Sequence, residues 1–207
     1  MIECQMVLTM LHLLEGLLTK DVLKNHQDML ETIVVFAAVW GFGSPLCNKD
    51  NIDWAKEFSA WWKSNFKNVK FPSRGTIFDY FVDMEEKKFE PWVKICPTIE
   101  YESSTPMSQV TVPTPETTSF DFLLDLLIPR GYPALLVGDA GTGKTQMLVG
   151  KLKKVHDTSN GDYVFSATAL NYFSNSMALQ DILEQSLEKK AGINFGPPGK
   201  AKMIYVV

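Results

Sequence analysis

Cysteine and histidine are scarce in this 207-residue chain, which contains three of each. The cysteines, Cys4, Cys47 and Cys96, are odd in number and far apart, so they suit neither a disulfide framework nor a zinc site. The three histidines are equally scattered and lack the spacing of metal ligands. This usage predicts a protein of a reducing compartment, with no cysteine or histidine metal site.

Long hydrophobic runs are also missing. The longest uncharged stretch, residues 32–48, is interrupted by Gly41, Gly43 and Pro45, and its apolar part ends at Trp40. A bilayer span needs about 20 predominantly apolar residues. The first four residues carry no basic region of the kind that opens a signal peptide. We therefore expect a buried helix of a soluble protein here, and no membrane partner.

No charge of one sign dominates the chain. It has 20 Lys and Arg against 24 Asp and Glu, a net charge of −4, and no long basic run. This balance argues against nucleic acid as a partner. With 45% hydrophobic and 21% charged residues, the composition is that of an ordinary globular protein. The length suits one full domain, or a small domain and part of another.

The most informative segment that is present is GDAGTGKT, residues 138–145. It fits the phosphate-binding pattern G-x-x-x-x-G-K-[ST]. The apolar residues 134–137 before it predict a buried strand, and residues 146–152 after it can continue as a helix. Strand, glycine-rich turn and helix form the context that this motif requires. The segment therefore predicts a nucleoside triphosphate site.

The residue types in this loop explain the predicted chemistry. Glycines allow successive backbone N–H groups to curl around a phosphate, and the following helix N-terminus favours an anion. We expect Lys144 to bridge the β- and γ-phosphates, and Thr145 to offer its hydroxyl to Mg²⁺. A carboxylate facing the phosphates would repel them, so Asp139 should point away. The remaining predicted nucleotide contacts in the loop are Gly138, Ala140, Gly141, Thr142 and Gly143.

Hydrophobic periodicity predicts the elements around the loop. In the first half we expect helices over residues 5–19, 27–40 and 51–66, then a hairpin of strands 76–82 and 88–93. Residues 97–116, rich in Pro, Ser and Thr, predict a connector. Beyond it we expect a helix over 116–127, a strand over 163–167, a helix over 177–190, a loop over 195–200 and a buried strand over 203–207. The aromatic residues of the third helix favour core packing over base stacking.

Several long strings make the chain recognisable. It resembles the AAA+ motor region of dynein heavy chains, and most closely the axonemal members. The strings that carry the resemblance, besides the phosphate loop, are FAAVWGFG (36–43), EFSAWW (57–62), VKFPSRGTIFDY (69–80), TPET (114–117), LQDILE (179–184), LEKKAG (187–192) and GPPG (196–199). Together they cover nearly the whole chain.

The resemblance implies an α/β fold, with a helical lid-like N-terminal half carrying a small β-hairpin, followed by a truncated P-loop AAA+ core with an incomplete parallel sheet. Residues 1–105 look like the lid and connector that end one module, and residues 106–207 look like the start of the next. The order of motifs favours the junction between the second and third modules over that between the first and second. By resemblance, Val112 and Pro113 lie near the adenine.

The resemblance also implies partners and a location. It implies ATP and Mg²⁺ as cofactors and other dynein modules and chains as partners, with microtubules reached only through parts absent from this chain. It places the protein in the cytoplasm or cytoskeleton, at the axoneme of the cilium. No targeting signal in the sequence supports this location independently.

The chain departs from the family pattern after residues 204–207. The family continues there with the acidic residues that hold the Mg²⁺ shell and orient the attacking water, and later with arginines that contact the γ-phosphate. We therefore assign no catalytic residue and expect an ATP-binding fragment that does not hydrolyse ATP alone. The alternative is a non-catalytic product that acts only as a structural or interaction piece of the dynein ring. Because the family's fourth strand would lie between the first and third, we also expect a poorly stable C-terminal half.

Overall fold

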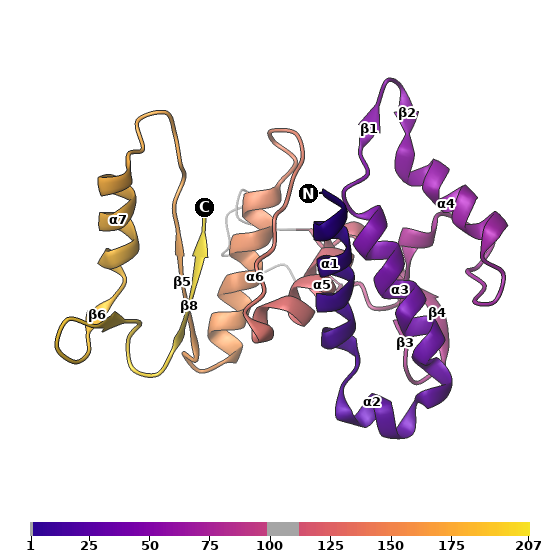
Figure 1. The fold of residues 1–207 in the computed structure, drawn as a ribbon, viewed down its shortest axis with the longest axis horizontal. Helices are drawn as coiled ribbons and strands as arrows, with labels where there is room; N and C mark the ends of the chain where they lie inside the picture. The colour runs from indigo at the N-terminus through magenta and orange to yellow at the C-terminus, as the bar shows by residue number, and fades with distance from the viewer. Residues whose placement is uncertain (1, 99–111) are drawn as a thin grey trace. The chain divides into compact units, whose positions relative to one another are not determined.

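The computed structural model describes residues 2–98 and 112–207, so most of the predicted connector lies outside the described residues. The chain forms two compact units, Met1–Leu135 and Leu136–Val207 (Figure 1). The division predicted from the sequence, between residues 105 and 106, would assign the helix after the connector to the second module. In the structure this helix, α5 (Pro115–Leu127), packs in the first compact unit, and the boundary between the two modules stays a prediction.

Two long helices, α1 (Ile2–Leu17) and α3 (Leu30–Gly43), pack together in the first unit. Between them lie α2 (Lys20–Asn25), whose first turn is capped by the Thr19 hydroxyl, and the 3₁₀ turn η1 (Gln27–Met29). The predicted end of the second helix at residue 40 is wrong. Helix α3 continues through Gly41 and Gly43, because these positions lack a side chain and allow close packing against neighbouring elements.

The next helix, α4 (Trp54–Asn65), begins three residues later than predicted. Strands β1 (Asn48–Lys49) and β2 (Ile52–Asp53) form a tight antiparallel hairpin before it. Its turn residues, Asp50 and Asn51, have φ angles of 55° and 61°, which Asp and Asn tolerate better than most residues. The Asp53 carboxylate then caps the helix by accepting a hydrogen bond from the Lys56 N–H at 3.1 Å.

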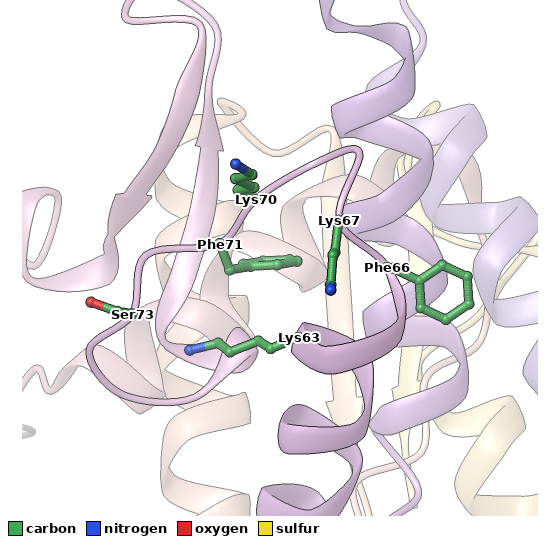
Figure 2. A pocket seen from close by; sticks show the side chains of 6 residues that line it. All are labelled: Lys63, Phe66, Lys67, Lys70, Phe71 and Ser73. Atoms are coloured by element: carbon green, nitrogen blue, oxygen red, sulfur yellow. The ribbon is translucent and has the colours of Figure 1, made fainter.

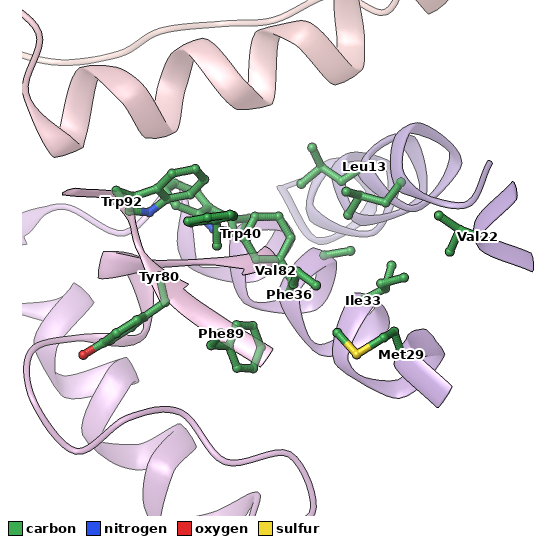
Figure 3. Close-up of a cluster of buried hydrophobic side chains, with 13 residues drawn as sticks. Leu13, Val22, Met29, Ile33, Phe36, Trp40, Tyr80, Val82, Phe89 and Trp92 are labelled. Atoms are coloured by element: carbon green, nitrogen blue, oxygen red, sulfur yellow. The ribbon is translucent and has the colours of Figure 1, made fainter. Parts of the chain in front are cut away.

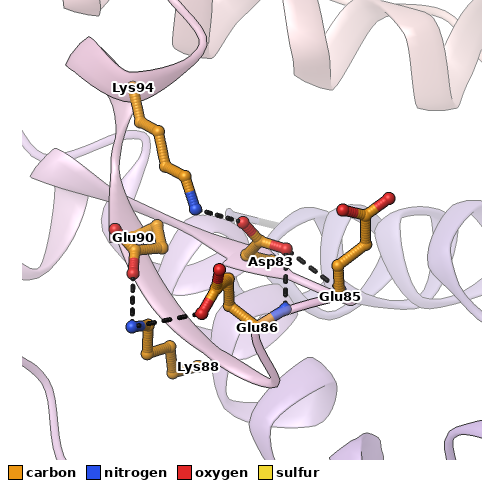
Figure 4. Close-up of polar contacts among 6 residues, drawn as sticks. All are labelled: Asp83, Glu85, Glu86, Lys88, Glu90 and Lys94. Carbon is orange, nitrogen blue, oxygen red and sulfur yellow. Dashed lines mark hydrogen bonds and ion pairs between the residues drawn. The ribbon is translucent and has the colours of Figure 1, made fainter.

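The predicted β-hairpin is confirmed, with shorter strands. Strands β3 (Tyr80–Asp83) and β4 (Lys88–Pro91) pair antiparallel. The first residues of the predicted strand 76–82 instead form the 3₁₀ turn η2 (Ile77–Asp79), because Thr76 and Asp79 make a reciprocal capping box. Beyond β4, the end of the predicted strand 88–93 forms η3 (Trp92–Lys94). Charged side chains around the hairpin form the ion-pair network of Figure 4.

The core of the first unit gathers apolar side chains from α1, α3 and the hairpin (Figure 3). Trp92 is 1% exposed, and its indole N–H donates to the Phe78 carbonyl oxygen at 2.8 Å. Helix α5 packs Phe122 and Leu126 against this core, and it is followed by η5 (Ile128–Arg130). The Thr114 capping box and Pro115 in the first turn explain why α5 begins there.

The second unit has a small parallel sheet with helices. It contains α6 (Lys144–Thr158), β5 (Tyr163–Ala167), α7 (Ser176–Gln185), β6 (Glu188–Lys189), β7 (Phe195–Gly196) and β8 (Lys202–Val206). Strands β5 and β8 pair in parallel, with Phe165 opposite Ile204 (Figure 1). The predicted mixed α/β class, a helical lid followed by a partial P-loop region, is confirmed.

Three predictions in this half need correction. Residues 134–137 form no strand: Leu135 is 86% and Val137 85% exposed. Among the described residues no strand pairs with this segment, and an extended segment without a hydrogen-bonded neighbour gains neither ladder bonds nor burial. Helix α7 ends at residue 185 instead of 190, and the predicted loop 195–200 begins as a strand. These last two differences have one cause: residues 188–189 form β6 and residues 195–196 form β7, and the two strands pair with each other.

Candidate nucleotide-binding site

The glycine-rich motif 138–145 lies entirely within the second unit, and its last two residues open helix α6. Gly141 and Gly143 have φ angles of 80° and 81°. This left-handed region favours glycine, because a side chain there strains the backbone. A Cβ atom built on either glycine meets nothing within 4 Å, so the space beside the turn is open. The loop therefore has the backbone form and the room that close approach of an anion requires.

The N-terminus of α6 adds a positive electrostatic field to this loop. Gly143 is the N-cap residue and offers no side-chain cap. The first N–H groups of a helix have no intrahelical acceptor, and the helix dipole places partial positive charge there. The first turn closes when the Met147 N–H donates to the Gly143 carbonyl oxygen at 2.9 Å. The N–H groups ahead of Met147 are the donors that a phosphate group needs.

Lys144 is held inside the loop by three hydrogen bonds. Its Nζ donates to the carbonyl oxygens of Gly138 at 2.9 Å and Asp139 at 2.6 Å, and to Thr142 Oγ1 at 3.0 Å. Thr142 Oγ1 in turn donates to the Asp139 carbonyl oxygen at 2.9 Å. An ammonium group has three donors, so this network satisfies all of them. The result is a positive charge fixed over the same turn that exposes the backbone N–H groups.

The sequence motif identified the lysine and the glycines but not this network. The acceptors for Lys144 are mainly backbone carbonyl oxygens, which no residue type signals. Thr142 was predicted only as a nucleotide contact, whereas the structure shows its hydroxyl linking the lysine to the loop backbone. Ala140 and Thr145 are exposed on the same loop.

Thr145 is the residue predicted to contact Mg²⁺. Its exposed hydroxyl makes no hydrogen bond with any described residue. No group of three or more His, Cys, Asp or Glu side chains in the described part of the chain could hold a metal ion. A hydroxyl together with phosphate oxygens and water is a donor set that Mg²⁺ accepts, because this ion takes few protein ligands. The loop therefore fits a magnesium-bound triphosphate.

The remaining site predictions concern the adenine contacts and the orientation of Asp139. Val112, which is 54% exposed, and Pro113 lie immediately before α5 in the first unit, whereas the phosphate loop belongs to the second. Their contact with adenine stays a prediction. So does the outward orientation of the Asp139 carboxylate. No helix in residues 2–98 and 112–207 is both long and apolar enough to cross a bilayer.

Comparison with known families agrees with this geometry. Residues 99–207 match the model of the P-loop containing dynein motor region, and residues 1–94 match that of the dynein heavy chain AAA lid domain. The first match alone covers more than half of the chain. The fold and the loop therefore define a lid followed by a P-loop region of an AAA motor. The chain belongs to the dynein heavy chain family.

The relatives are axonemal, ciliary and flagellar dyneins. The chain is 42% identical over 207 residues to dynein axonemal heavy chain 9 of Homo sapiens and to a ciliary dynein beta chain of Heliocidaris crassispina. It is 40% identical over 208 residues to the alpha chain of the flagellar outer arm dynein of Chlamydomonas reinhardtii. Each match covers 99% of this chain but only 4% of the relative. The chain therefore corresponds to a small part of an axonemal-type heavy chain.

Proposed function

We propose that this chain binds ATP with Mg²⁺ through the phosphate loop 138–145. The observation that carries the proposal is the combination of an open glycine turn, a helix N-terminus without a side-chain cap and a lysine ammonium held over both. Each of these features favours an anion, and together they favour several negative charges at one place. The family match to a P-loop motor region supports the same reading.

The residues of the loop have separate parts in this binding. The backbone N–H groups from residue 141 onward and the first turn of α6 hold the phosphates. Lys144 exchanges its bonds to the Gly138 and Asp139 carbonyl oxygens for phosphate oxygens, which are stronger acceptors because they are charged. The Thr145 hydroxyl would hold the metal, which would supply positive charge to neutralise the phosphate oxygens.

Hydrolysis is not part of the proposal for these 207 residues alone. Phosphoryl transfer needs a carboxylate that orients water and an arginine that stabilises the transition state, in addition to the lysine and metal. We assign neither role to any residue of this chain. We also propose, from the order of motifs, that the segment corresponds to the junction of the second and third modules of a ciliary dynein ring. Its partners would then be the other modules and chains of that motor.

The affinity of the chain for a fluorescent ATP analogue, measured in the presence of Mg²⁺, tests the proposal. Lys144→Ala removes the ammonium and should weaken binding about 10- to 100-fold, because a hydrogen bond to a charged group contributes about 1.5–3 kcal/mol. Lys153→Ala is the matched control, since Lys153 is exposed on the same helix but lies nine residues from Lys144. Binding by the control should equal that of the unmodified chain.

A second candidate function, an interaction piece without nucleotide, is favoured by one observation. The Lys144 ammonium already has all three of its hydrogen bonds within the loop, so its donors are satisfied without an anion. The same assay separates the two functions. Equal ATP affinity of the unmodified chain and Lys144→Ala, or no binding by either, would leave only the interaction role.

A further inference from the structure

A segment whose charged residues are all basic lies in the first unit, far along the sequence from the phosphate loop. Residues 58–78 contain Lys63, Lys67, Lys70 and Arg74 and no Asp or Glu, in a chain whose net charge is −4. Lys63 lies in the last turn of α4, where a cation interacts favourably with the helix dipole. The other three cations lie beyond the helix, so this effect does not explain them.

Three of these cations line one pocket (Figure 2). The lysine pocket, as we call it, is an open depression with a volume of about 460 Å³. Figure 2 shows the three lysine side chains around the ring of Phe71. The pocket is lined by Lys63, Phe66, Lys67, Lys70, Phe71 and Ser73.

Internal contacts fix the walls of the lysine pocket. Lys63 Nζ donates to the carbonyl oxygens of Pro72 at 2.9 Å and Gly75 at 2.8 Å, which ties the loop after α4 back to the helix. Burial lowers the pKa of the Lys63 ammonium, and nearby Asp79 partly opposes this effect. Phe71 stacks on Phe89 with ring centroids 4.0 Å apart. Lys63 and Phe71 therefore act as structural parts of the pocket.

The other two lysines of the pocket, Lys67 and Lys70, differ from Lys63 in their contacts. Neither Lys67 nor Lys70 makes a hydrogen bond or ion pair with any residue in the described part of the chain, and both are exposed. Several other lysines of the first unit do pair with carboxylates, for example Lys87 with Asp28 and Lys94 with Asp83. The lysine pocket thus offers two unpaired ammonium groups beside aromatic surface, where Phe66 is 48% exposed.

We propose that the lysine pocket binds an acidic peptide segment of a partner protein, with carboxylates on Lys67 and Lys70 and an apolar side chain against Phe66 and Phe71. Charge complementarity selects the acidic partner, and the exposed ring of Phe66 beside the half-buried ring of Phe71 selects an apolar residue between the acids. Nucleic acid fits less well. Four cations on a chain of net charge −4 supply few phosphate contacts, and the remaining acidic surface repels a polyanion.

Fluorescence anisotropy with a labelled peptide, Glu-Glu-Leu-Glu-Glu, tests this site on the full chain. The double variant Lys67→Glu with Lys70→Glu should weaken binding at least tenfold. Lys153→Glu with Lys154→Glu is the matched control, because these lysines are also exposed and both double variants change the net charge from −4 to −8. The control should bind the peptide within about twofold of the unmodified chain, and binding should weaken as salt is added.

Three results would overturn the proposal. One is equal loss of binding in both double variants, which would show a net-charge effect without a site. Another is equal binding of the peptide Lys-Lys-Leu-Lys-Lys. The third is tighter binding of a ten-residue oligothymidylate than of the acidic peptide at the same salt, which would assign the pocket to nucleic acid. If the variants fold poorly, backbone NMR of the unmodified chain decides: peptide-induced shifts must centre on residues 63–73, and shifts elsewhere would refute the site.

Discussion

Replacing Gly41 with alanine tests how closely the two long helices of the first unit are packed. Gly41 lies in α3, and a Cβ atom there would be 2.7 Å from Met10 Cβ and 2.9 Å from both Cα and N of Met10. Carbon atoms in contact are normally about 3.5–4.0 Å apart. Two of the three close atoms are backbone, so no side-chain rotation relieves the clash. Helix α1 must move away from α3 by roughly 1 Å.

The size of the effect follows from two opposing terms. Overpacking a core costs about 1–3 kcal/mol, and a clash with backbone belongs in the upper part of that range. Alanine has a better helix propensity than glycine by about 1 kcal/mol. The expected net loss is therefore about 1–2 kcal/mol in the free energy of unfolding. Buried core residues of the two helices, such as Leu13 and Ile33, would lose contacts as the helices separate.

Urea unfolding followed by tryptophan fluorescence measures this loss. All five tryptophans, Trp40, Trp54, Trp61, Trp62 and Trp92, belong to the first unit, so the signal reports on its unfolding. Gly150→Ala in α6 is the control, and its unfolding is followed by circular dichroism. A Cβ atom at this position meets nothing within 4 Å, so the substitution should stabilise the helix by up to about 1 kcal/mol. A Gly41→Ala protein that unfolds at the same or a higher urea concentration would refute the packing argument.

Two further predictions concern polar contacts of the first unit. Ser59→Ala should cost about 1–3 kcal/mol in urea unfolding, because the buried Ile77 N–H loses the Ser59 Oγ acceptor at 3.0 Å. The exposed Ser64→Ala should change the stability by less than about 0.5 kcal/mol, and equal effects at the two serines would contradict this reasoning. The hydrogen bond from Lys94, together with backbone N–H donors, holds the pKa of Asp83 below its ordinary value of 3.8. The stability that Asp83 contributes is therefore present above the unfolded-state pKa and is lost as the pH falls through the folded-state pKa. Unfolding midpoints of Asp83→Asn and the unmodified chain should differ at neutral pH and converge in acid; a constant difference would refute the assignment.

Local sequence signals predicted much of this fold because local interactions determine those elements. Helix α5 begins at Pro115, one residue before its predicted start and with its predicted end at Leu127, and strand β5 has its predicted bounds. Prediction failed where long-range contacts decide the outcome. Residues 134–137 have a strand-like composition but no partner strand among the described residues. Helix α3 continues through two glycines because neighbouring elements pack against them, which no local pattern reveals.

The candidate site likewise has features that the sequence predicted and features that it did not. Motif spacing was sufficient to propose the glycines and Lys144 as phosphate contacts, since phosphate binding requires those residue types in that order, and these contacts stay a prediction. The bonds from Lys144 to the Gly138 and Asp139 carbonyl oxygens depend on how the backbone turns, so the sequence did not reveal them. The lysine pocket was missed because its cations are spread over a helix end and a loop, with no motif to join them.

Amide hydrogen exchange with and without Mg-ATP tests the central claim most directly, because it shows where on the chain the nucleotide binds. If the phosphate loop is the site, exchange should slow at residues 140–146, whose N–H groups surround the turn and open α6. The same protection should be absent in Lys144→Ala. Unchanged exchange over these residues at saturating Mg-ATP, or protection confined to another part of the chain, would contradict the account.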